Sequence, residues 1–317
     1  MKAVLLDKVT LGTDISFQEI EHLCDITYYD NTTPAELHER IEKAEIIITN
    51  KVVIDDEAMA AAKNLKLICV SATGYDHVDI PSAKKHGIVV CNVAGYSTES
   101  VAQRVLGYML TFANSVLTVE KDMQDGLWQK SKSFVLLNRP LFELHGKTLG
   151  IVGYGKIGQR VASLARAFGM NILIAESIRT PGKAEGRTPL TDLLRRSDIV
   201  SLHVPLNADS RDLIARKELA LMKPSAMLIN AARGGVVNER DLYEALEAGE
   251  IAYAATDVLT QEPPTEGNIL FRAKNMMITP HIAWASPEAR TQLLAGITRN
   301  ITLFQQGKGD SIDICKQ

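Results

Sequence analysis

Three polar residues suited to acid–base chemistry on an anion, Arg233, Asp257 and His281, each stand directly after a short apolar run. The runs are rich in small and β-branched residues, which is typical of strands buried in a parallel sheet. In open parallel sheets, ligands bind outside the carboxyl ends of the strands. We therefore expect an arginine, a carboxylate and a histidine at one edge of one sheet.

These side chains suit the reduction of a 2-keto acid. Arg233 can bind a carboxylate through two parallel hydrogen bonds, and the two glycines after it let backbone approach a ligand. Histidine moves a proton most easily near neutral pH, so His281 is the candidate proton donor. A carboxylate beside it would stabilise the charged ring. Glu262 lies in a Gln-Glu-Pro-Pro segment, but spacing alone does not bring it to His281.

A glycine-rich turn predicts a dinucleotide site. Gly153, Gly155 and Gly158 follow the apolar run 149–152 and precede the helix-like run 159–168. Glycines at this spacing permit a tight turn, close approach of backbone to a pyrophosphate, and close packing of helix on strand. The N–H groups at the start of the helix then face the anion.

The residues after the next strand bear on which dinucleotide binds. Glu176 follows the apolar run 172–175, near the distance at which a carboxylate accepts from the adenosine ribose. A carboxylate there would repel a 2′-phosphate, which favours NAD over NADP. Arg179 weakens this inference, because it could neutralise Glu176 or hold a phosphate.

Composition excludes several classes of protein. The chain has 317 residues, 46% hydrophobic and 23% charged, with a net charge of −3, so we expect two globular domains and no nucleic-acid partner. The N-terminus lacks a secretory signal and no apolar run approaches the roughly 20 residues of a membrane span. We expect no membrane partner and no metal. Cys69 and Cys91 lie in apolar runs and are interpreted as buried inert thiols, which fits a cytoplasmic protein.

Apolar runs alternate with helix-like segments in two series, which predicts two parallel α/β sheets. The first series has helices at 34–43 and 57–63, and strands at 4–6, 46–49, 67–71 and 88–91. The second has strands at 148–152, 171–175, 199–204, 227–230, 252–255 and 276–279. A long helix over 97–119 would leave the first domain, and a last helix near 287–306 would return to it. The expected domains are therefore 1–97 with 288–317, and 98–287.

Several segments together resemble the D-isomer-specific 2-hydroxyacid dehydrogenases. They are residues 149–158, 230–237, 257–259, 262–263 and 279–284, and the resemblance covers nearly the whole chain. It implies an α/β protein of two Rossmann-like domains with parallel sheets, the cofactor domain being inserted into a flavodoxin-like substrate domain. It also implies an active site in the cleft and a homodimer formed through the cofactor domain.

The resemblance also implies residue roles. Arg233 would anchor the substrate carboxylate, His281 would be the acid/base, and Glu262 would be its carboxylate partner. Asp257 would hold the nicotinamide carboxamide. The same resemblance places Arg233 and His281 beside both cofactor and substrate. Further cofactor contacts would be Gly153, Gly155, Lys156, Ile157, Gly158, Glu176 and Ala231. The substrate loop would be Ser71, Ala72, Thr73 and Gly74, with backbone amides facing the substrate carboxylate.

Within the family, residues 92–103 most resemble glycerate dehydrogenases, also called hydroxypyruvate reductases. The leading hypothesis is therefore NAD-dependent hydride transfer between hydroxypyruvate and D-glycerate. A D-lactate or branched 2-keto acid dehydrogenase is an alternative, because the same catalytic residues would serve it. An NAD(H)-sensing, corepressor-like binding protein is a rival from another class.

Overall fold

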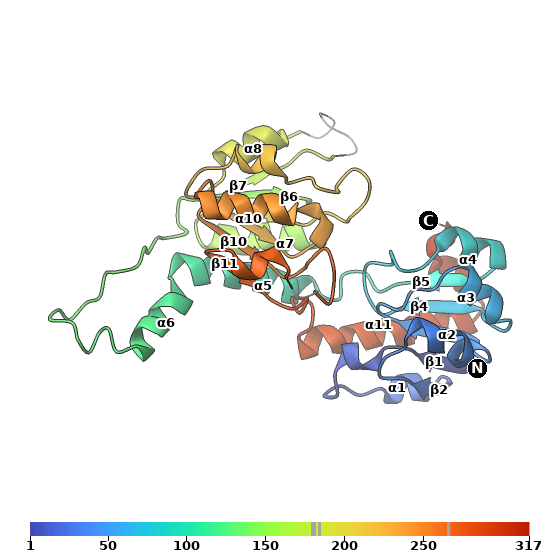
Figure 1. Cartoon of the computed structure of the whole chain (residues 1–317). Coiled ribbons are helices and arrows are strands. Elements are labelled where there is room, and N and C mark those ends of the chain that lie inside the picture. Colours follow the sequence, from blue (N-terminus) through green and yellow to red (C-terminus); the bar gives the residue numbers. More distant parts are fainter. Residues whose placement is uncertain (179–181, 183–184, 265–266, 317) are drawn as a thin grey trace. The chain divides into compact units, whose positions relative to one another are not determined.

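The chain forms two compact units, one of residues 1–97 with 284–317 and the other of residues 98–283 (Figure 1). The structure is a computed structural model and describes residues 1–178, 182, 185–264 and 267–316. Each unit contains one sheet in which all strand pairs are parallel. Two α/β units with parallel sheets confirm the fold class predicted from the two series of apolar runs.

The sheet of the first unit has the strand order β2-β1-β3-β4-β5. This is the flavodoxin-like order, in which the chain reverses its direction of winding between β1 and β3. Its strands are β1 (Lys2–Leu5), β2 (Asp25–Tyr28), β3 (Ile46–Thr49), β4 (Leu67–Val70) and β5 (Val89–Cys91).

Helices cover both faces of this sheet because alternate strand residues point to opposite sides. Ile47 and Ile68 pack in one core with α2 (Pro34–Ile41), α3 (Asp56–Ala61) and α4 (Ile80–His86). The alternate strand positions pack in a second core with helices α1 (Gln18–Glu21) and α11 (Pro287–Gln305). Cys69 and Cys91 lie in this second core and are each 1% exposed, which confirms that they are buried.

The sheet of the second unit has the order β11-β10-β9-β8-β6-β7. The winding direction reverses between β6 and β8, so a ligand site is expected at the carboxyl ends of these two strands. The strands are β6 (Thr148–Val152), β7 (Asn171–Ile174), β8 (Ile199–Leu202), β9 (Met227–Asn230), β10 (Tyr253–Thr256) and β11 (Met276–Ile278).

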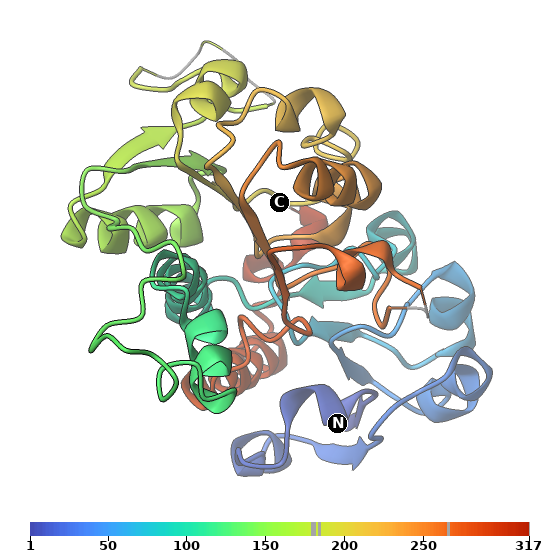
Figure 2. The same cartoon turned by 60° about the vertical axis from the view of Figure 1, so that its left-hand side comes forward.

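Helices also cover the sheet of the second unit. Helix α5 (Thr98–Ala113) packs against α7 (Lys156–Ala167), which packs against β6 and β7 (Figure 2). One face of α5 is buried, since Val101, Val105 and Met109 lie in the core. Another core contains residues of three further helices, α8 (Leu190–Arg196), α9 (Arg216–Leu219) and α10 (Glu239–Ala248).

The structure differs from the sequence-based prediction in three places. The helix expected over 97–119 ends at Ala113, because Ser115 has a φ of +48° that no α-helix accommodates, and α6 (Val116–Gln124) follows. Strand β2 was not predicted, since it is a half-exposed edge strand without an apolar run. The units separate at 283/284 rather than 287/288, because Trp284 packs edge-on against Tyr96 of the first unit, with ring centroids 6.1 Å apart.

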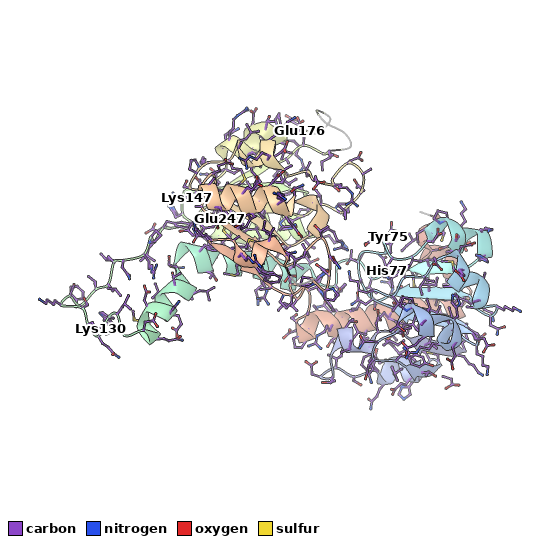
Figure 3. All side chains as sticks on the ribbon, in the orientation of Figure 1. Tyr75, His77, Lys130, Lys147, Glu176 and Glu247 are labelled. Carbon is purple, nitrogen blue, oxygen red and sulfur yellow. The ribbon has the colours of Figure 1, made fainter. Side chains whose placement is uncertain are left out.

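A long excursion within the second unit, residues 116–141, follows α5. Helix α6 and the irregular residues 125–143 project away from the sheet of their own unit (Figure 1), and Lys130 marks their far end (Figure 3). The excursion exposes large apolar side chains, including Leu117, Trp128, Phe134, Leu137 and Leu141. Among all the described residues, no helix is long and apolar enough to cross a bilayer.

Candidate active site

The glycine turn between β6 and α7 is tight where backbone crowds it and open where a ligand would approach. Gly153 has a φ of +94°, and a Cβ there would lie 2.4 Å from the His203 carbonyl oxygen. A Cβ on Gly158 would lie 2.2 Å from the Gly153 carbonyl oxygen, whereas one on Gly155 would meet nothing within 4 Å. With Lys156 at the start of α7, this turn fits the pyrophosphate of a dinucleotide.

A pocket of about 330 Å³ lies beside the glycine turn, where β6, β7 and β8 end. Glu176, directly after the Ala175 bridge residue, lines this pocket and is labelled in Figure 3. Arg187 lines it too, donates to the Ala175 carbonyl (3.3 Å), and lies over the Tyr154 ring. The pocket therefore has the carboxylate expected for an adenosine ribose. Arg179 lies outside the described residues.

The end of β9 shapes the Arg233 turn. Asn230 donates from Nδ2 to the Arg233 carbonyl (2.8 Å), and its Oδ1 accepts from the Ala232 amide (3.1 Å). The Arg233 guanidinium donates to the Ala232 carbonyl (2.8 Å) and is partly exposed. Asn230 thus closes a side-chain-to-backbone turn that presents Ala231 and Arg233 at the sheet edge.

Asp257, at the end of β10, holds the backbone after β11. Its Oδ2 accepts from the Ala283 amide (2.7 Å), and its Oδ1 accepts from the Ile282 amide (3.0 Å) and the Thr279 hydroxyl (2.5 Å). The Thr279 hydroxyl also bonds the buried Tyr108 hydroxyl. Burial raises the pKa of Asp257, which is 2% exposed. This carboxylate therefore organises the 279–283 backbone beneath the histidine.

The side chain of His281 pairs with the carboxylate of Glu262 rather than with that of Asp257. The His281 Nδ1 lies 2.5 Å from Glu262 Oε2, with the two side chains 23% and 30% exposed. His281 has a φ of +55°, and its amide donates to the Asp257 carbonyl (2.8 Å). Positive φ is uncommon for a non-glycine residue and clusters at functional sites. The pair is an imidazole oriented by a carboxylate, an arrangement suited to general acid–base catalysis.

The predicted substrate loop belongs to the first unit and follows β4. Ser71 is fully buried: its amide donates to the Thr49 carbonyl (2.8 Å), and its hydroxyl has no partner in the described structure. Thr73 is exposed, and the Asn92 amide group donates to its carbonyl (2.6 Å). Ala72 and Gly74 are partly exposed. The accessible part of this loop is therefore residues 72–74.

Three structurally important residues were not identified from the sequence: Asn230, Thr279 and Glu239. The first two stand beside Arg233 and His281 at strand ends, so proximity to those residues was a usable signal. Glu239 begins α10, and nothing in its spacing pointed to the acid–base pair. Its contacts are described below.

The fold and the glycine turn define a dinucleotide-dependent oxidoreductase. Residues 106–283 match the model of the D-isomer specific 2-hydroxyacid dehydrogenase, NAD binding domain. The chain is 39% identical over 314 residues to a glycerate dehydrogenase of Methylorubrum extorquens, which covers 98% of each protein. The chain belongs to the D-isomer-specific 2-hydroxyacid dehydrogenase family, whose cofactor is NAD.

Two further relatives span nearly the whole chain. A hydroxypyruvate reductase of Blautia hydrogenotrophica is 35% identical over 314 residues, covering 97% of this chain and 98% of the relative. The crystal structure of a D-lactate dehydrogenase from Aquifex aeolicus, complexed with NAD and lactic acid, has a TM-score of 0.82 and 28% identity. That match covers 98% of this chain and 97% of the other. The names of these relatives include both enzyme activities considered from the sequence, hydroxypyruvate reduction and D-lactate dehydrogenation.

Proposed function

We propose that the protein reduces hydroxypyruvate to D-glycerate with NADH, and catalyses the reverse reaction with NAD. The observation that carries the chemistry is the 2.5 Å contact between His281 Nδ1 and Glu262 Oε2. Similarity to a glycerate dehydrogenase and a hydroxypyruvate reductase over nearly the full chain supports the choice of substrate.

In this mechanism the carboxylate of Glu262 fixes the orientation of the imidazole and stabilises its protonated form. With Nδ1 engaged by Glu262, the Nε2 atom of His281 donates the proton to the keto oxygen during reduction. It takes that proton back from the hydroxyl during oxidation. The Asp257 carboxylate holds the two amides that follow the histidine, and its carbonyl accepts from the His281 amide, so the backbone that carries the ring is fixed.

Arg233 binds the substrate carboxylate and polarises the neighbouring carbonyl. Its guanidinium offers paired donors that match a carboxylate, and the Asn230 turn holds its backbone. Residues 72–74 of the first unit have accessible backbone and remain the proposed substrate loop, while the buried Ser71 supports that loop through its bond to the Thr49 carbonyl. In this assignment the first unit is the substrate domain and the second is the cofactor domain.

The second unit has a site that fits NAD. The Gly153–Gly158 turn and the start of α7 would hold the pyrophosphate, and Glu176 would accept from the adenosine ribose. Lys156, Ile157, Ala231 and Asp257 are proposed to complete the cofactor contacts. When bound, the nicotinamide supplies or accepts the hydride.

We further propose a homodimer formed through the excursion of residues 116–141. Its exposed apolar residues include Phe134 (88%), Leu137 (79%) and Leu117 (61%). Apolar groups at this density are uncommon on a monomer's surface and mark interaction sites.

The four cysteines are all free thiols, which supports a reducing compartment such as the cytoplasm.

The test is NADH oxidation by the purified protein, with hydroxypyruvate, glyoxylate, pyruvate and 2-ketoisocaproate compared side by side. The highest kcat/KM for hydroxypyruvate would support the proposal. The highest kcat/KM for pyruvate would instead favour a D-lactate dehydrogenase, the activity named for the Aquifex aeolicus relative. Tight NADH binding without turnover of any of these acids would favour a cofactor-sensing protein.

A further inference from the structure

Glu262 lies on an irregular segment, although it must hold His281 in one orientation. The described residues of this segment, 257–264 and 267–268, lie between β10, which ends at Thr256, and the 3₁₀ helix η3 (Ile269–Arg272). Groups in a loop without a regular hydrogen-bond ladder move more than those on strands. A catalytic partner placed there needs supporting contacts that restrict it, because small displacements of catalytic groups reduce turnover strongly.

One carboxylate, that of Glu239, bridges the two ends of this segment. Its Oε1 accepts from the Thr260 amide at 2.6 Å, and its Oε2 accepts from the Asn268 side-chain amide at 3.2 Å. Asn268 in turn caps η3, since its Oδ1 accepts from the Leu270 amide at 3.1 Å. Glu239 therefore sets the separation between the point where the segment leaves β10 and the point where it enters η3.

The contact at Thr260 leads directly to the acid–base pair. The adjacent Leu259 amide donates to Oε1 of Glu262 (2.8 Å), and Oε2 of the same carboxylate contacts His281. The backbone of Leu259 also packs against Gly234, where a Cβ would lie 2.0 Å from the Leu259 carbonyl carbon. A shift at Thr260 would therefore move the amide that positions Glu262.

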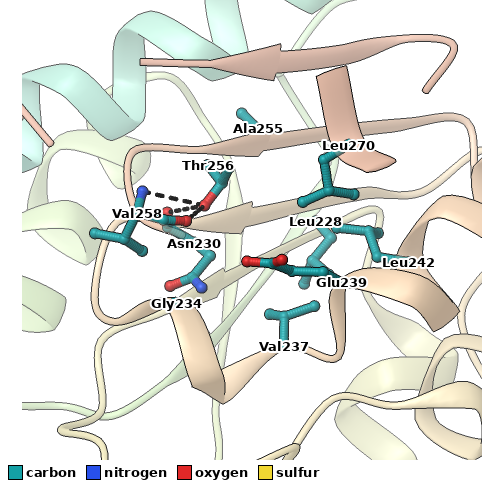
Figure 4. Close-up of a pocket in the computed structure, with 10 residues that line it drawn as sticks. All are labelled: Leu228, Asn230, Gly234, Val237, Glu239, Leu242, Ala255, Thr256, Val258 and Leu270. Atoms are coloured by element: carbon teal, nitrogen blue, oxygen red, sulfur yellow. Dashed lines mark hydrogen bonds between the residues drawn. The ribbon is translucent and has the colours of Figure 1, made fainter. Parts of the chain in front are cut away.

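Glu239 itself lies at the start of a capped and packed helix. It is the first residue of the ten-residue helix α10, whose N-cap Asn238 accepts from the Asp241 amide and whose apolar face is buried. A carboxylate in the first helical turn is stabilised by the helix dipole. Glu239 lines a cavity of about 10 Å³ with Asn230 and Thr256, and Figure 4 shows its carboxylate turned toward the strand ends that carry them. This volume is at the lower limit of what one water molecule needs.

We propose that Glu239 is a positioning residue for the Glu262–His281 pair. It acts by bridging Thr260 and Asn268, so that the segment presents Glu262 to the imidazole in one geometry. The role in turnover rests on the proposed function, whereas the structural coupling of Glu239 to His281 does not.

The first experiment compares E239A with E247A and E239Q. Glu247 is a matched control, because it lies on the same helix and also accepts from a loop amide, that of Lys274 (3.0 Å). We expect E239A to lower kcat by roughly 10- to 100-fold, with little change in NADH affinity measured by fluorescence. E247A should match the wild type, and E239Q should recover part of the activity.

A double-mutant cycle separates positioning from a general loss of stability. If Glu239 acts through Glu262, E239A should reduce kcat much less in an E262Q background than in the wild type. An equal reduction in both backgrounds would overturn the proposal, and so would equal losses in E239A and E247A. Wild-type kcat in E239A would overturn it as well.

A spectroscopic measurement keeps this test independent of the substrate. The ring-nitrogen chemical shifts of His281 report which nitrogen carries the proton and how strongly Nδ1 is hydrogen-bonded. E239A should move these shifts toward those of E262Q, whereas E247A should leave them unchanged. Shifts in E239A identical to the wild type would reject the positioning role even in a protein that reduces none of the acids tested. Shifts that move as expected without turnover would reject the proposed function alone.

Discussion

The Nδ1 atom of His281 and the Oε2 atom of Glu262 lie 2.5 Å apart, although the two residues come from different kinds of structure. His281 follows β11 and its amide donates to the Asp257 carbonyl, whereas Glu262 stands in an irregular segment. The pair combines a ring on the sheet edge with a carboxylate brought to it from a loop. Catalysis should therefore depend on both residues, but to different degrees.

Replacing His281 with alanine should lower kcat by about 10²–10⁴-fold, because the proton donor is lost. E262Q retains an oxygen for hydrogen bonding but loses the charge, so we expect a smaller loss of kcat than in H281A. Steady-state kinetics across pH tests both variants. Full activity in H281A would remove the histidine from the mechanism.

A second prediction concerns the choice of cofactor. Glu176 lines the adenosine pocket, where its carboxylate would repel the 2′-phosphate of NADPH, while Arg187 of the same pocket would attract it. E176A should raise the ratio of kcat/KM for NADPH to that for NADH by at least about 10-fold, because like charges held close together are strongly unfavourable. R187A should lower the same ratio.

The control for this prediction is E185A, since Glu185 is exposed and does not line the pocket. Its cofactor ratio should equal that of the wild type. Fluorescence titration with each cofactor gives the affinities separately from turnover. A ratio in E176A no different from that in E185A would show that Glu176 does not select the cofactor.

The sheet and its edge residues could be predicted because they depend on local sequence. Buried parallel strands require short apolar runs, and the residues that follow each run must lie at the carboxyl edge of the sheet. This rule predicted the position of Arg233, Asp257 and His281 at that edge. The glycine turn was also predictable, because only glycine fits the crowded positions at Gly153 and Gly158.

What could not be predicted depends on how segments distant in the sequence meet. Glu262 reaches His281 through an irregular path that no periodicity describes, so only the resemblance suggested their pairing. The support from Glu239 depends on contacts with both ends of that path. The helix break at Ser115 has no glycine or proline to signal it. Local patterns therefore located the edge of the site, and tertiary contacts set its geometry.

A third prediction follows from His203, which comes directly after β8 beside the glycine turn. Burial lowers the pKa of His203 to about 4, below its usual value of about 6.5. The unfolded chain therefore takes up this proton first as pH falls. The stabilisation from the neutral ring is fully present above about pH 6.5, and it is lost as pH falls through about 4.

Differential scanning calorimetry between pH 7 and about 4 tests this window. The melting temperature of H203Q should fall less steeply with decreasing pH than that of the wild type, because glutamine carries no titrating group. H22Q provides a control, since His22 is exposed at the end of α1. Parallel curves for H203Q and the wild type would contradict the prediction.

A fourth prediction concerns Asp122, which ties the two limbs of the 116–141 excursion together. Its carboxylate is 3% exposed and accepts from Arg139 Nη2 (2.6 Å), Arg139 Nε (2.8 Å) and Asn138 Nδ2 (2.9 Å). The Arg139 guanidinium lowers the pKa of Asp122 to about 2, so the carboxylate stays charged at neutral pH. This paired contact joins α6 to the returning chain and holds the apolar residues between them in one arrangement.

D122N removes the charge that attracts Arg139 and should loosen the excursion. If the excursion forms the dimer interface, its apolar residues must be ordered before they bury surface, and ordering a mobile segment weakens association. We expect the dimer dissociation constant to rise by at least about 10-fold, measured by sedimentation velocity over a dilution series. D125N is the control, since Asp125 is exposed at the end of α6. A D122N dimer as tight as that of D125N would place the interface elsewhere, whereas selective weakening in D122N would assign it to this excursion.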